Sequence, residues 1–152
     1  MTPQEFIAAI LPGALASQAA DKIPAGFTIA QCALETGWLH SVPPGNNLFG
    51  IKADSAWAGP TVDVVTHEVR NGVRVQETDA FRSYPSYVAS IVDHGDFLRA
   101  NPRYADCFKT TDSVAFSEAV AGYGYATDPL YCDKLTQIIR AHDLTQYDLA
   151  PT

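Results

Sequence analysis

The sequence contains little positive charge and few cysteines. Its 10 lysine and arginine residues stand against 17 aspartate and glutamate residues, so the formal net charge is -7. Proteins bind nucleic acid largely through Lys and Arg side chains, which neutralise phosphates and release the counterions bound to them. The excess of acidic residues therefore argues against nucleic acid as a partner. It also provides no electrostatic attraction to anionic membranes or other polyanions. Binding to such a target would therefore depend on a local site.

Other absences concern metals, membranes and export. The three cysteines, Cys32, Cys107 and Cys132, lack metal-ligand spacing, and we expect them to be small apolar residues of the core. No segment reaches the roughly 20 apolar residues of a membrane span. The N-terminus lacks the basic start and apolar run of a signal peptide, so any export is expected to use another route. The sequence has no HExxH spacing and no Gly-rich phosphate loop, so it indicates neither zinc nor a nucleotide.

The chain is predicted to form a single domain over residues 1–152. It has 47% hydrophobic residues, and no repeat or linker divides it. Thr2-Pro3 and Glu5 predict the N-cap and capping box of a first helix. Pro12-Gly13 predicts an interruption of that helix before a second helical segment, Ala14 to Ala20.

The strongest helix signal lies between Pro24 and Gly37. Proline at the start, a broad apolar surface and a left-handed glycine stop predict a helix whose last turn contains Glu35. Residues 41–47 are rich in Pro, Gly and Asn, and residues 48–52 are too few for a helix. Both segments therefore predict a loop.

The period of the pattern changes to two over residues 62–82. Asn71-Gly72 lies between the alternating segments, as a type I′ hairpin turn requires. The expected register sets Arg70 opposite Val73, Glu68 opposite Val75, Thr66 opposite Glu77 and Val64 opposite Asp79. Three carboxylates, those of Glu68, Glu77 and Asp79, therefore share one face.

The remaining segments predict helices. The helical period returns after Pro85 and ends before Asn101-Pro102, and shorter helices are expected over 104–108 and 114–120. Asp128-Pro129 is expected to cap the last helix. Everything outside the hairpin is then helix or loop, so the fold class is α+β and mostly helical.

Glu35 is the first candidate for catalysis. The negative end of the helix dipole and an apolar setting beside Leu34 and Trp38 disfavour its charged form, so its pKa should rise. A protonated carboxyl can give its proton to a leaving sugar oxygen, while an ionised carboxylate opposite stabilises the ring or activates water. The alternative is a solvated surface residue, the usual state of a glutamate near a helix end. Candidates for the second carboxylate are Glu68, Glu77 and Asp79.

A series of motifs runs along nearly the whole chain. They are Ala33-Leu34-Glu35-Thr36-Gly37-Trp38, Asn46-Asn47-Leu48-Phe49-Gly50-Ile51-Lys52, Thr66-His67-Glu68 before Asn71-Gly72, Ala80-Phe81-Arg82-Ser83-Tyr84, Asn101-Pro102-Arg103-Tyr104-Ala105, and Ala121-Gly122-Tyr123-Gly124-Tyr125-Ala126-Thr127-Asp128-Pro129, then Tyr131 and Lys134-Leu135. In this order they resemble the glucosaminidase family of peptidoglycan hydrolases, which includes the wall-cutting domain of the flagellar rod protein. The segment at 121–129 is longer than the family's Ala-Gly-Tyr-Ala-Thr-Asp-Pro and holds two tyrosines.

The resemblance implies a lysozyme-like fold with one β-hairpin lobe over a glycan cleft. It also implies that Glu35 is the general acid and that Glu68, on a lobe that closes over the substrate, is the second carboxylate. Glu77 and Asp79 are the alternatives. The family's tyrosine aligns with Tyr125, implied in transition-state support through the substrate N-acetyl group, with Tyr123 as its possible substitute. The sequence leaves open an inverting route, with carboxyls about 6.5 to 9.5 Å apart, and a substrate-assisted one.

Four residues near Glu35 are candidate substrate contacts. Trp38 and Phe49 would stack on sugar rings, while Asn46 and Asn47 would hydrogen-bond acetamido or hydroxyl groups. Each has a structural alternative, because large aromatic residues usually pack in the core and asparagines hold turns.

The resemblance predicts an endo-β-N-acetylglucosaminidase that cleaves the β-1,4 bond between N-acetylglucosamine and N-acetylmuramic acid in peptidoglycan, without metal or cofactor. The alternatives are a muramidase, a lytic transglycosylase, or a non-catalytic wall-docking module of a phage, flagellar or secreted assembly. Intact Glu35 and Glu68 argue against the module. Action is expected at the bacterial cell wall, in the periplasm or outside the cell. Delivery would use a holin, a virion or a secretion system, and an effector would have an immunity partner.

Overall fold

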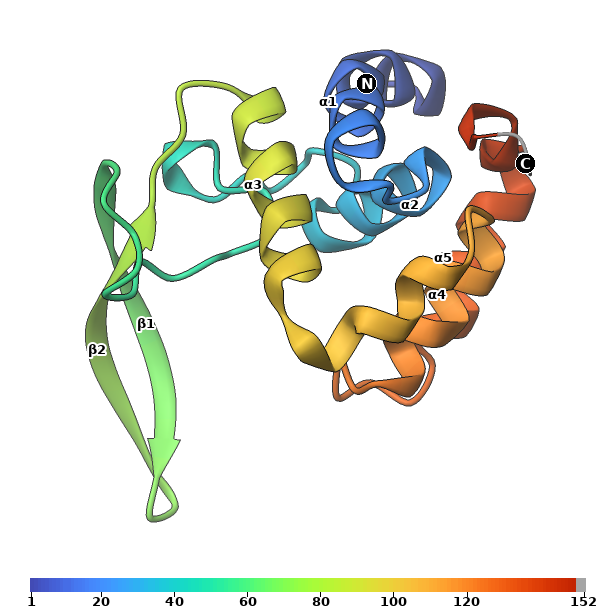
Figure 1. Cartoon of the computed structure of the whole chain (residues 1–152). Helices are drawn as coiled ribbons and strands as arrows, with labels where there is room; N and C mark the ends of the chain where they lie inside the picture. The colour runs from blue at the N-terminus through green and yellow to red at the C-terminus, as the bar shows by residue number, and fades with distance from the viewer. Residues whose placement is uncertain (150–152) are drawn as a thin grey trace.

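The computed structural model describes residues 1–149 and shows a helical body with a β-hairpin on one side (Figure 1). The α-helices are α1 (Pro3–Asp21), α2 (Ala25–Thr36), α3 (Tyr87–Ala100), α4 (Ser113–Gly122) and α5 (Tyr131–Ala141). The described part also contains the 3-10 helices η1 (Pro44–Asn46), η2 (Pro102–Lys109) and η3 (Leu144–Tyr147), and the antiparallel strands β1 (Thr61–Arg70) and β2 (Val73–Arg82). The predicted α+β, mostly helical class is confirmed.

Helix α1 begins as predicted but is not interrupted. The Thr2 hydroxyl accepts a hydrogen bond from the Glu5 backbone, and the Glu5 carboxylate accepts one from the Thr2 backbone, which completes the capping box. The predicted break at Pro12-Gly13 is wrong, because the helix continues through Pro12 on its exposed side, where water can satisfy the freed carbonyl. Gly13 allows close packing, since a Cβ there would lie 2.5 Å from Ile91 Cδ1 of α3.

Helix α2 is almost entirely buried and lies in the core. It ends as predicted at Gly37, whose φ is 56° and whose backbone N–H donates to the Ala33 carbonyl. No side chain next to it in sequence caps its N-terminus. Instead the Asp148 carboxylate accepts hydrogen bonds from the backbone N–H of Gly26 at 3.0 Å and of Ser113 at 2.8 Å. One carboxylate thus joins the starts of α2 and α4.

The predicted hairpin and its register are confirmed. Asn71 and Gly72 have φ values of 53° and 76°, as a type I′ turn requires. The observed pairs include Glu68 with Val75, Thr66 with Glu77 and Val64 with Asp79. Side chains at 62, 64, 66 and 68 on β1 and at 75, 77, 79 and 81 on β2 are partly buried, while those between them are exposed. The three carboxylates therefore lie on the same, partly buried face.

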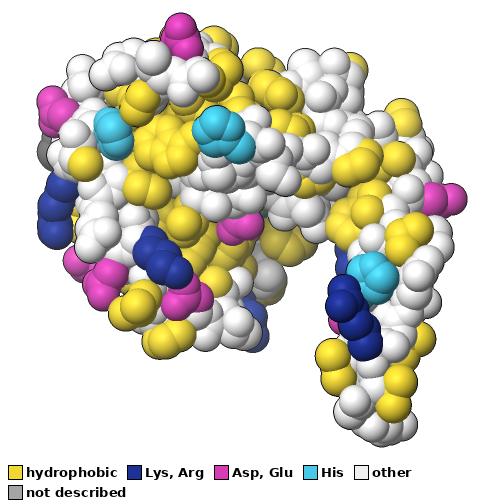
Figure 2. Space-filling model, turned by 180° about the vertical axis from the view of Figure 1, so that it is seen from behind, with side chains coloured by type: hydrophobic (Ala, Val, Ile, Leu, Met, Phe, Trp, Pro, Cys, Tyr) yellow, Lys and Arg dark blue, Asp and Glu magenta, His cyan; other side chains and the backbone are white. Residues whose placement is uncertain are grey.

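The hairpin stands apart from the helical body. Figure 2 shows open space between the hairpin arm and the body. No residue from Thr61 to Phe81 is buried, and Arg82 at the base of β2 is the first that is. Beyond the hairpin itself, β1 makes a small contact with η1, and the strands contact the other described elements less still. Sparse burial of this kind means that local motion costs little free energy.

The other helices agree with the sequence in place and differ at their ends. Residues 104–108 lie within η2, and η3 was not predicted. The predicted cap at Asp128-Pro129 is wrong, because α5 starts at Tyr131 without a side-chain cap, and Asp128 accepts a hydrogen bond from the Leu130 backbone in the turn that precedes the helix. Cys32 and Cys107 are buried as expected, whereas Cys132 is only partly buried. No helix between residues 1 and 149 combines the length and apolar character needed to cross a membrane.

Candidate active site

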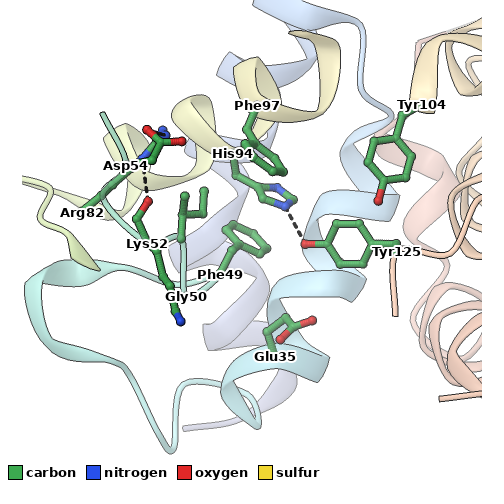
Figure 3. Close-up of a pocket in the computed structure, with 11 residues that line it drawn as sticks. Glu35, Phe49, Gly50, Lys52, Asp54, Arg82, His94, Phe97, Tyr104 and Tyr125 are labelled. Carbon is green, nitrogen blue, oxygen red and sulfur yellow. Dashed lines mark hydrogen bonds and ion pairs between the residues drawn. The ribbon is translucent and has the colours of Figure 1, made fainter. Parts of the chain in front are cut away.

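A pocket of 520 Å³ opens at the end of α2 (Figure 3). Its lining comes from α2 (Glu35), the loop before β1 (Phe49, Gly50, Ile51, Lys52 and Asp54), the end of β2 (Arg82), α3 (His94 and Phe97), η2 (Tyr104) and the turn after α4 (Tyr125). Distant segments thus form one concave site, the usual architecture of a ligand pocket. Three of the predicted site residues, Glu35, Phe49 and Tyr125, meet here.

Glu35 combines access to solvent with a raised pKa. Its side chain is exposed at the pocket, yet partial desolvation by the surrounding protein raises the pKa of its carboxyl. The Tyr131 hydroxyl donates to Glu35 Oε1 at 3.3 Å and offsets part of that rise. Gln31 Nε2 donates in turn to the Tyr131 hydroxyl at 3.0 Å. The predicted direction of the pKa shift is confirmed, and the side chain that contacts the carboxyl is Tyr131.

Of the two candidate tyrosines, Tyr125 lines the pocket and Tyr123 does not. The Tyr125 hydroxyl lies 2.8 Å from His94 Nε2, and desolvation raises its pKa, so the phenol is neutral. Burial lowers the pKa of His94 to about 3, so the imidazole is neutral as well. Phe49 stacks on this imidazole with ring centroids 3.9 Å apart. Tyr123 instead donates its hydroxyl to Asp106 at the surface.

Ion pairs distinguish the three carboxylates of the hairpin face. Asp79 lies 3.3 Å from Lys52 Nζ, and Glu77 pairs with Arg70. Within residues 1–149, Glu68 has neither an ion pair nor a side-chain hydrogen bond. Because Lys52 also lines the pocket, the face that carries Glu68 turns toward the pocket loop. Glu68 itself is not part of the lining.

The two candidate asparagines hold the pocket loop in shape. Asn47 is fully buried. Its amide donates to the carbonyls of Ile51 and Arg82 and accepts from the Ile51 backbone N–H. Asn46 donates to the Tyr84 carbonyl at 3.0 Å. The full burial of Asn47 leaves no surface for the predicted sugar contact, and its bonds match the turn-holding alternative.

The two candidate aromatic contacts, Phe49 and Trp38, also differ in their position relative to the pocket. Phe49 lines the pocket against His94. Trp38 lies outside the lining, and its ring packs edge-on at 5.0 Å from both Phe6 and His142. Its φ of 60° follows the left-handed turn after α2 and directs the side chain toward α1. Trp38 is therefore partly buried and packs against the core, which matches the structural alternative to a sugar contact.

Several pocket residues were not expected, chiefly Arg82, His94 and Phe97. A usable signal exists for His94, which shares the buried side of α3 with Ile91 and Leu98. A histidine on an apolar helix face needs a hydrogen-bond partner, and here the partner is Tyr125. Tyr104 and Tyr131 lie in the motifs that resemble the family, but the sequence alone assigned them no role.

The pocket offers groups for proton transfer together with aromatic surface. Glu35 supplies an acid, Tyr125 a neutral phenol, and Phe49 and Phe97 apolar rings. Across residues 1–149, no three or more His, Cys, Asp and Glu side chains are grouped so that they could hold a metal ion. This set of groups suits acid-catalysed cleavage of a sugar bond.

The chain matches the family model Glucosaminidase, described as mannosyl-glycoprotein endo-beta-N-acetylglucosaminidase, over residues 11–144. It belongs to the glucosaminidase family. It is 40% identical over 143 residues to the peptidoglycan hydrolase FlgJ of Vibrio parahaemolyticus, an alignment that covers 90% of this chain and 46% of that protein. The chain thus spans less than half the length of that relative.

Solved structures confirm the lysozyme-like fold. The truncated glycoside hydrolase domain of FlgJ from Salmonella typhimurium superposes with a TM-score of 0.81 and 32% identity, covering 93% of this chain and 98% of that one. The catalytic domain of the autolysin Auto from Listeria monocytogenes gives a TM-score of 0.83 and 31% identity, with coverage of 96% and 87%. The chain is therefore a glycoside hydrolase domain of the glucosaminidase family.

Proposed function

We propose that this glucosaminidase domain is an endo-β-N-acetylglucosaminidase that hydrolyses the β-1,4 bond between N-acetylglucosamine and N-acetylmuramic acid in peptidoglycan. The observation that carries the proposal is Glu35, a carboxyl of raised pKa that shares a pocket with the neutral phenol of Tyr125. The relatives named peptidoglycan hydrolases support peptidoglycan as the substrate polymer. The description of the family supports a bond next to N-acetylglucosamine.

Glu35 acts as the general acid in this proposal. Because desolvation raises the pKa of its carboxyl, the protonated form persists to higher pH than for an ordinary glutamate. The carboxyl gives its proton to the glycosidic oxygen as the bond to the anomeric carbon breaks, and the electron pair of that bond leaves with the oxygen. The Tyr131 hydroxyl, 3.3 Å from Glu35 Oε1, then stabilises the carboxylate that results.

Tyr125 supports the positively charged sugar ring through the substrate N-acetyl group. When His94 Nε2 carries its hydrogen, it donates to the Tyr125 oxygen and leaves the phenol hydrogen free for the substrate. A hydrogen bond from the phenol can hold the N-acetyl group next to the anomeric carbon. In a substrate-assisted route, the acetamido oxygen attacks that carbon, and water later opens the cyclic intermediate.

Glu68 serves the alternative, inverting route, in which it takes a proton from the attacking water. Lys52 neutralises Asp79 and Arg70 neutralises Glu77, which leaves Glu68 as the carboxylate of this face without an ion pair among the described residues. Closure of the hairpin would bring Glu68 over the cleft, and its sparse contact with the body permits such a movement. Proton NMR of the first product separates the routes, because inversion yields the α anomer and substrate assistance the β anomer.

Digestion of purified peptidoglycan tests the proposal. The proteins are the wild type, Glu35→Gln and the control Glu118→Gln, which changes an exposed glutamate of α4. The fragments are reduced with borohydride and their ends identified by mass spectrometry. We expect reduced N-acetylglucosamine ends from the wild type and the control, and about 1000-fold slower release by Glu35→Gln, the scale of a lost general acid.

Other products would change the assignment. Reduced muramic acid ends would indicate a muramidase, and anhydromuramic ends a lytic transglycosylase. No fragments from any protein, with equal binding of peptidoglycan by the wild type and Glu35→Gln, would indicate a wall-docking module.

We propose that the domain acts on the cell wall, in the periplasm or outside the cell, because its relatives are named for peptidoglycan hydrolysis. Delivery by a holin, a virion or a secretion system, and an immunity partner, stay predictions. Detection of the protein in periplasmic, medium and virion fractions of producing cells tests them.

A further inference from the structure

A second pocket, of 460 Å³, adjoins the first. Asp54, Arg82 and Phe97 line both pockets. Figure 3 shows these three residues in the part of the first pocket that lies away from Glu35. Beyond them the second pocket continues to Trp57 and to the end of α3. The two pockets are therefore adjacent, and the second lies on the side of these residues away from the acid.

The second pocket has aromatic walls. Phe97 is 41% exposed. Trp57 is fixed in place, because its indole N–H donates to the Pro60 carbonyl at 2.8 Å. Its ring also packs against Gly59, where a Cβ would lie 2.6 Å from the indole. An aromatic ring held in this way loses little conformational freedom when a ligand stacks on it.

The polar groups of the second pocket favour an uncharged ligand. Arg82 is the sole cation among the described residues that line it. The guanidinium is already paired with Asp93 at 2.9 Å and Asp54 at 3.5 Å, and it lies 4.8 Å from the centroid of the Trp57 ring. It is therefore not free to bind an anion. Asp54 and Asp96 add carboxylate oxygens, which accept hydrogen bonds from hydroxyl groups and repel carboxylates.

We propose that the second pocket is a distal subsite that binds an N-acetylglucosamine ring of the same glycan strand, stacked on the aromatic wall of Trp57 and Phe97. This inference rests on the proposed function, because it assumes that the strand also occupies the first pocket. An N-acetylmuramic acid ring with a free lactyl carboxylate fits the subsite poorly, since three aspartates and one arginine line it. The domain therefore prefers long strands to short ones.

The length dependence of cleavage tests the subsite. We would compare kcat/KM for tetrasaccharide and octasaccharide strands from peptidoglycan. The wild type should gain about tenfold from the longer strand, the order that an aromatic contact provides. Trp57→Ala should lose this gain, whereas Trp57→Phe, which keeps an aromatic face, should keep most of it. Val88→Ala is the control, an exposed apolar residue of α3 outside both pockets.

Equal gains in the wild type and Trp57→Ala would overturn the subsite. Cleavage of peptidoglycan by the wild type with no effect of strand length would overturn it too, while leaving the proposed function intact. No cleavage of either strand or of whole peptidoglycan would instead refute the proposed function.

Binding without turnover provides a second readout. The protein has two tryptophans, and Trp38 packs between Phe6 and His142, outside both pockets. The fluorescence of Glu35→Gln therefore reports contact with Trp57. We expect the hexamer of N-acetylglucosamine to change the emission and to bind about tenfold more tightly than the dimer. Equal affinity for both oligomers, with unchanged emission, would contradict the subsite even if the wild type cleaves the wall.

Discussion

The helical body and the hairpin hold their candidate catalytic groups in different ways. Glu35 belongs to a helix that is almost entirely buried, and its carboxyl is held by Tyr131. Glu68 belongs to a ribbon in which no residue from Thr61 to Phe81 is buried. A raised pKa requires a fixed, partly desolvated setting, which only the body provides. The comparison shows that a site can place its acid on a rigid part and leave a second carboxylate on a movable one.

Shortening the hairpin is the most severe test of this division. If Asn-Gly replaces residues 64–79, it joins Asp63 and Ala80, which already face each other across the strands. We expect the rate of wall cleavage to fall by about 10²- to 10⁴-fold because Glu68 is lost. The melting temperature of the body should change little. Turbidity of wall suspensions and thermal unfolding measure the two effects. A full rate would show that Glu35 and the substrate N-acetyl group suffice.

Single carboxylate variants sharpen the comparison within the hairpin. We expect Glu68→Gln to lower kcat by about 100-fold and Glu77→Gln to change it by less than about threefold, because Arg70 already neutralises Glu77. Rates of release of reducing ends measure both. A larger loss in Glu77→Gln than in Glu68→Gln would assign the role of the second catalytic carboxylate to Glu77.

Stability should depend on the body far more than on the hairpin. Asp148→Ala removes the shared cap of α2 and α4, so we expect it to lower the free energy of unfolding by about 2 to 4 kcal/mol. Asp63→Ala, at an exposed position of β1, should change it by less than about 0.5 kcal/mol. Urea denaturation followed by circular dichroism gives both values. Similar losses in the two variants would contradict the division.

The smallest expected effect is a shift in pH dependence. The Tyr131 hydroxyl donates to the Glu35 carboxylate and so lowers the pKa of Glu35. Tyr131→Phe removes this bond, so the pKa rises further and the protonated acid persists to higher pH. The alkaline limb of the profile of kcat/KM against pH should then move to higher pH. The control is Tyr147→Phe, on η3 and outside the pocket. An equal shift in this variant would show that the alkaline limb does not report the protonation of Glu35.

Local features were predictable from the sequence. Asn71-Gly72 determines the turn, and the turn determines the whole register of the hairpin. Gly37 ends α2 because its left-handed conformation suits glycine, so the position of Glu35 followed as well. The motifs that resemble the family then led to Tyr125, which the structure places in the pocket.

Features that depend on packing between distant segments were not predictable. Pro12-Gly13 predicts a break in α1, but the helix continues because Pro12 lies on its exposed side, while Gly13 packs against Ile91 of α3. The sequence makes Asn47 a candidate sugar contact, but beside Ile51 in its own loop it holds the carbonyl of Arg82, 35 residues away, which it meets only in the folded chain. The role of His94 does not follow from the sequence, because its partner, Tyr125, lies 31 residues away. Sequence periodicity gives the face of a helix, not the side chain that it will meet.

The hydrogen bond between Asp148 and Gly26 also sets an order of events on the ribosome. The two residues are 122 positions apart, so α2 is fully synthesised long before this bond can form, and until then the start of α2 has only the Gln18 side chain, which accepts from the Ala25 backbone N–H at 2.8 Å. Contacts at such a separation form late, since a long loop must close first. A nascent chain thus exposes the helix that carries Glu35 without the carboxylate that secures its start, and the acid gains its full support only after residue 148 has been added.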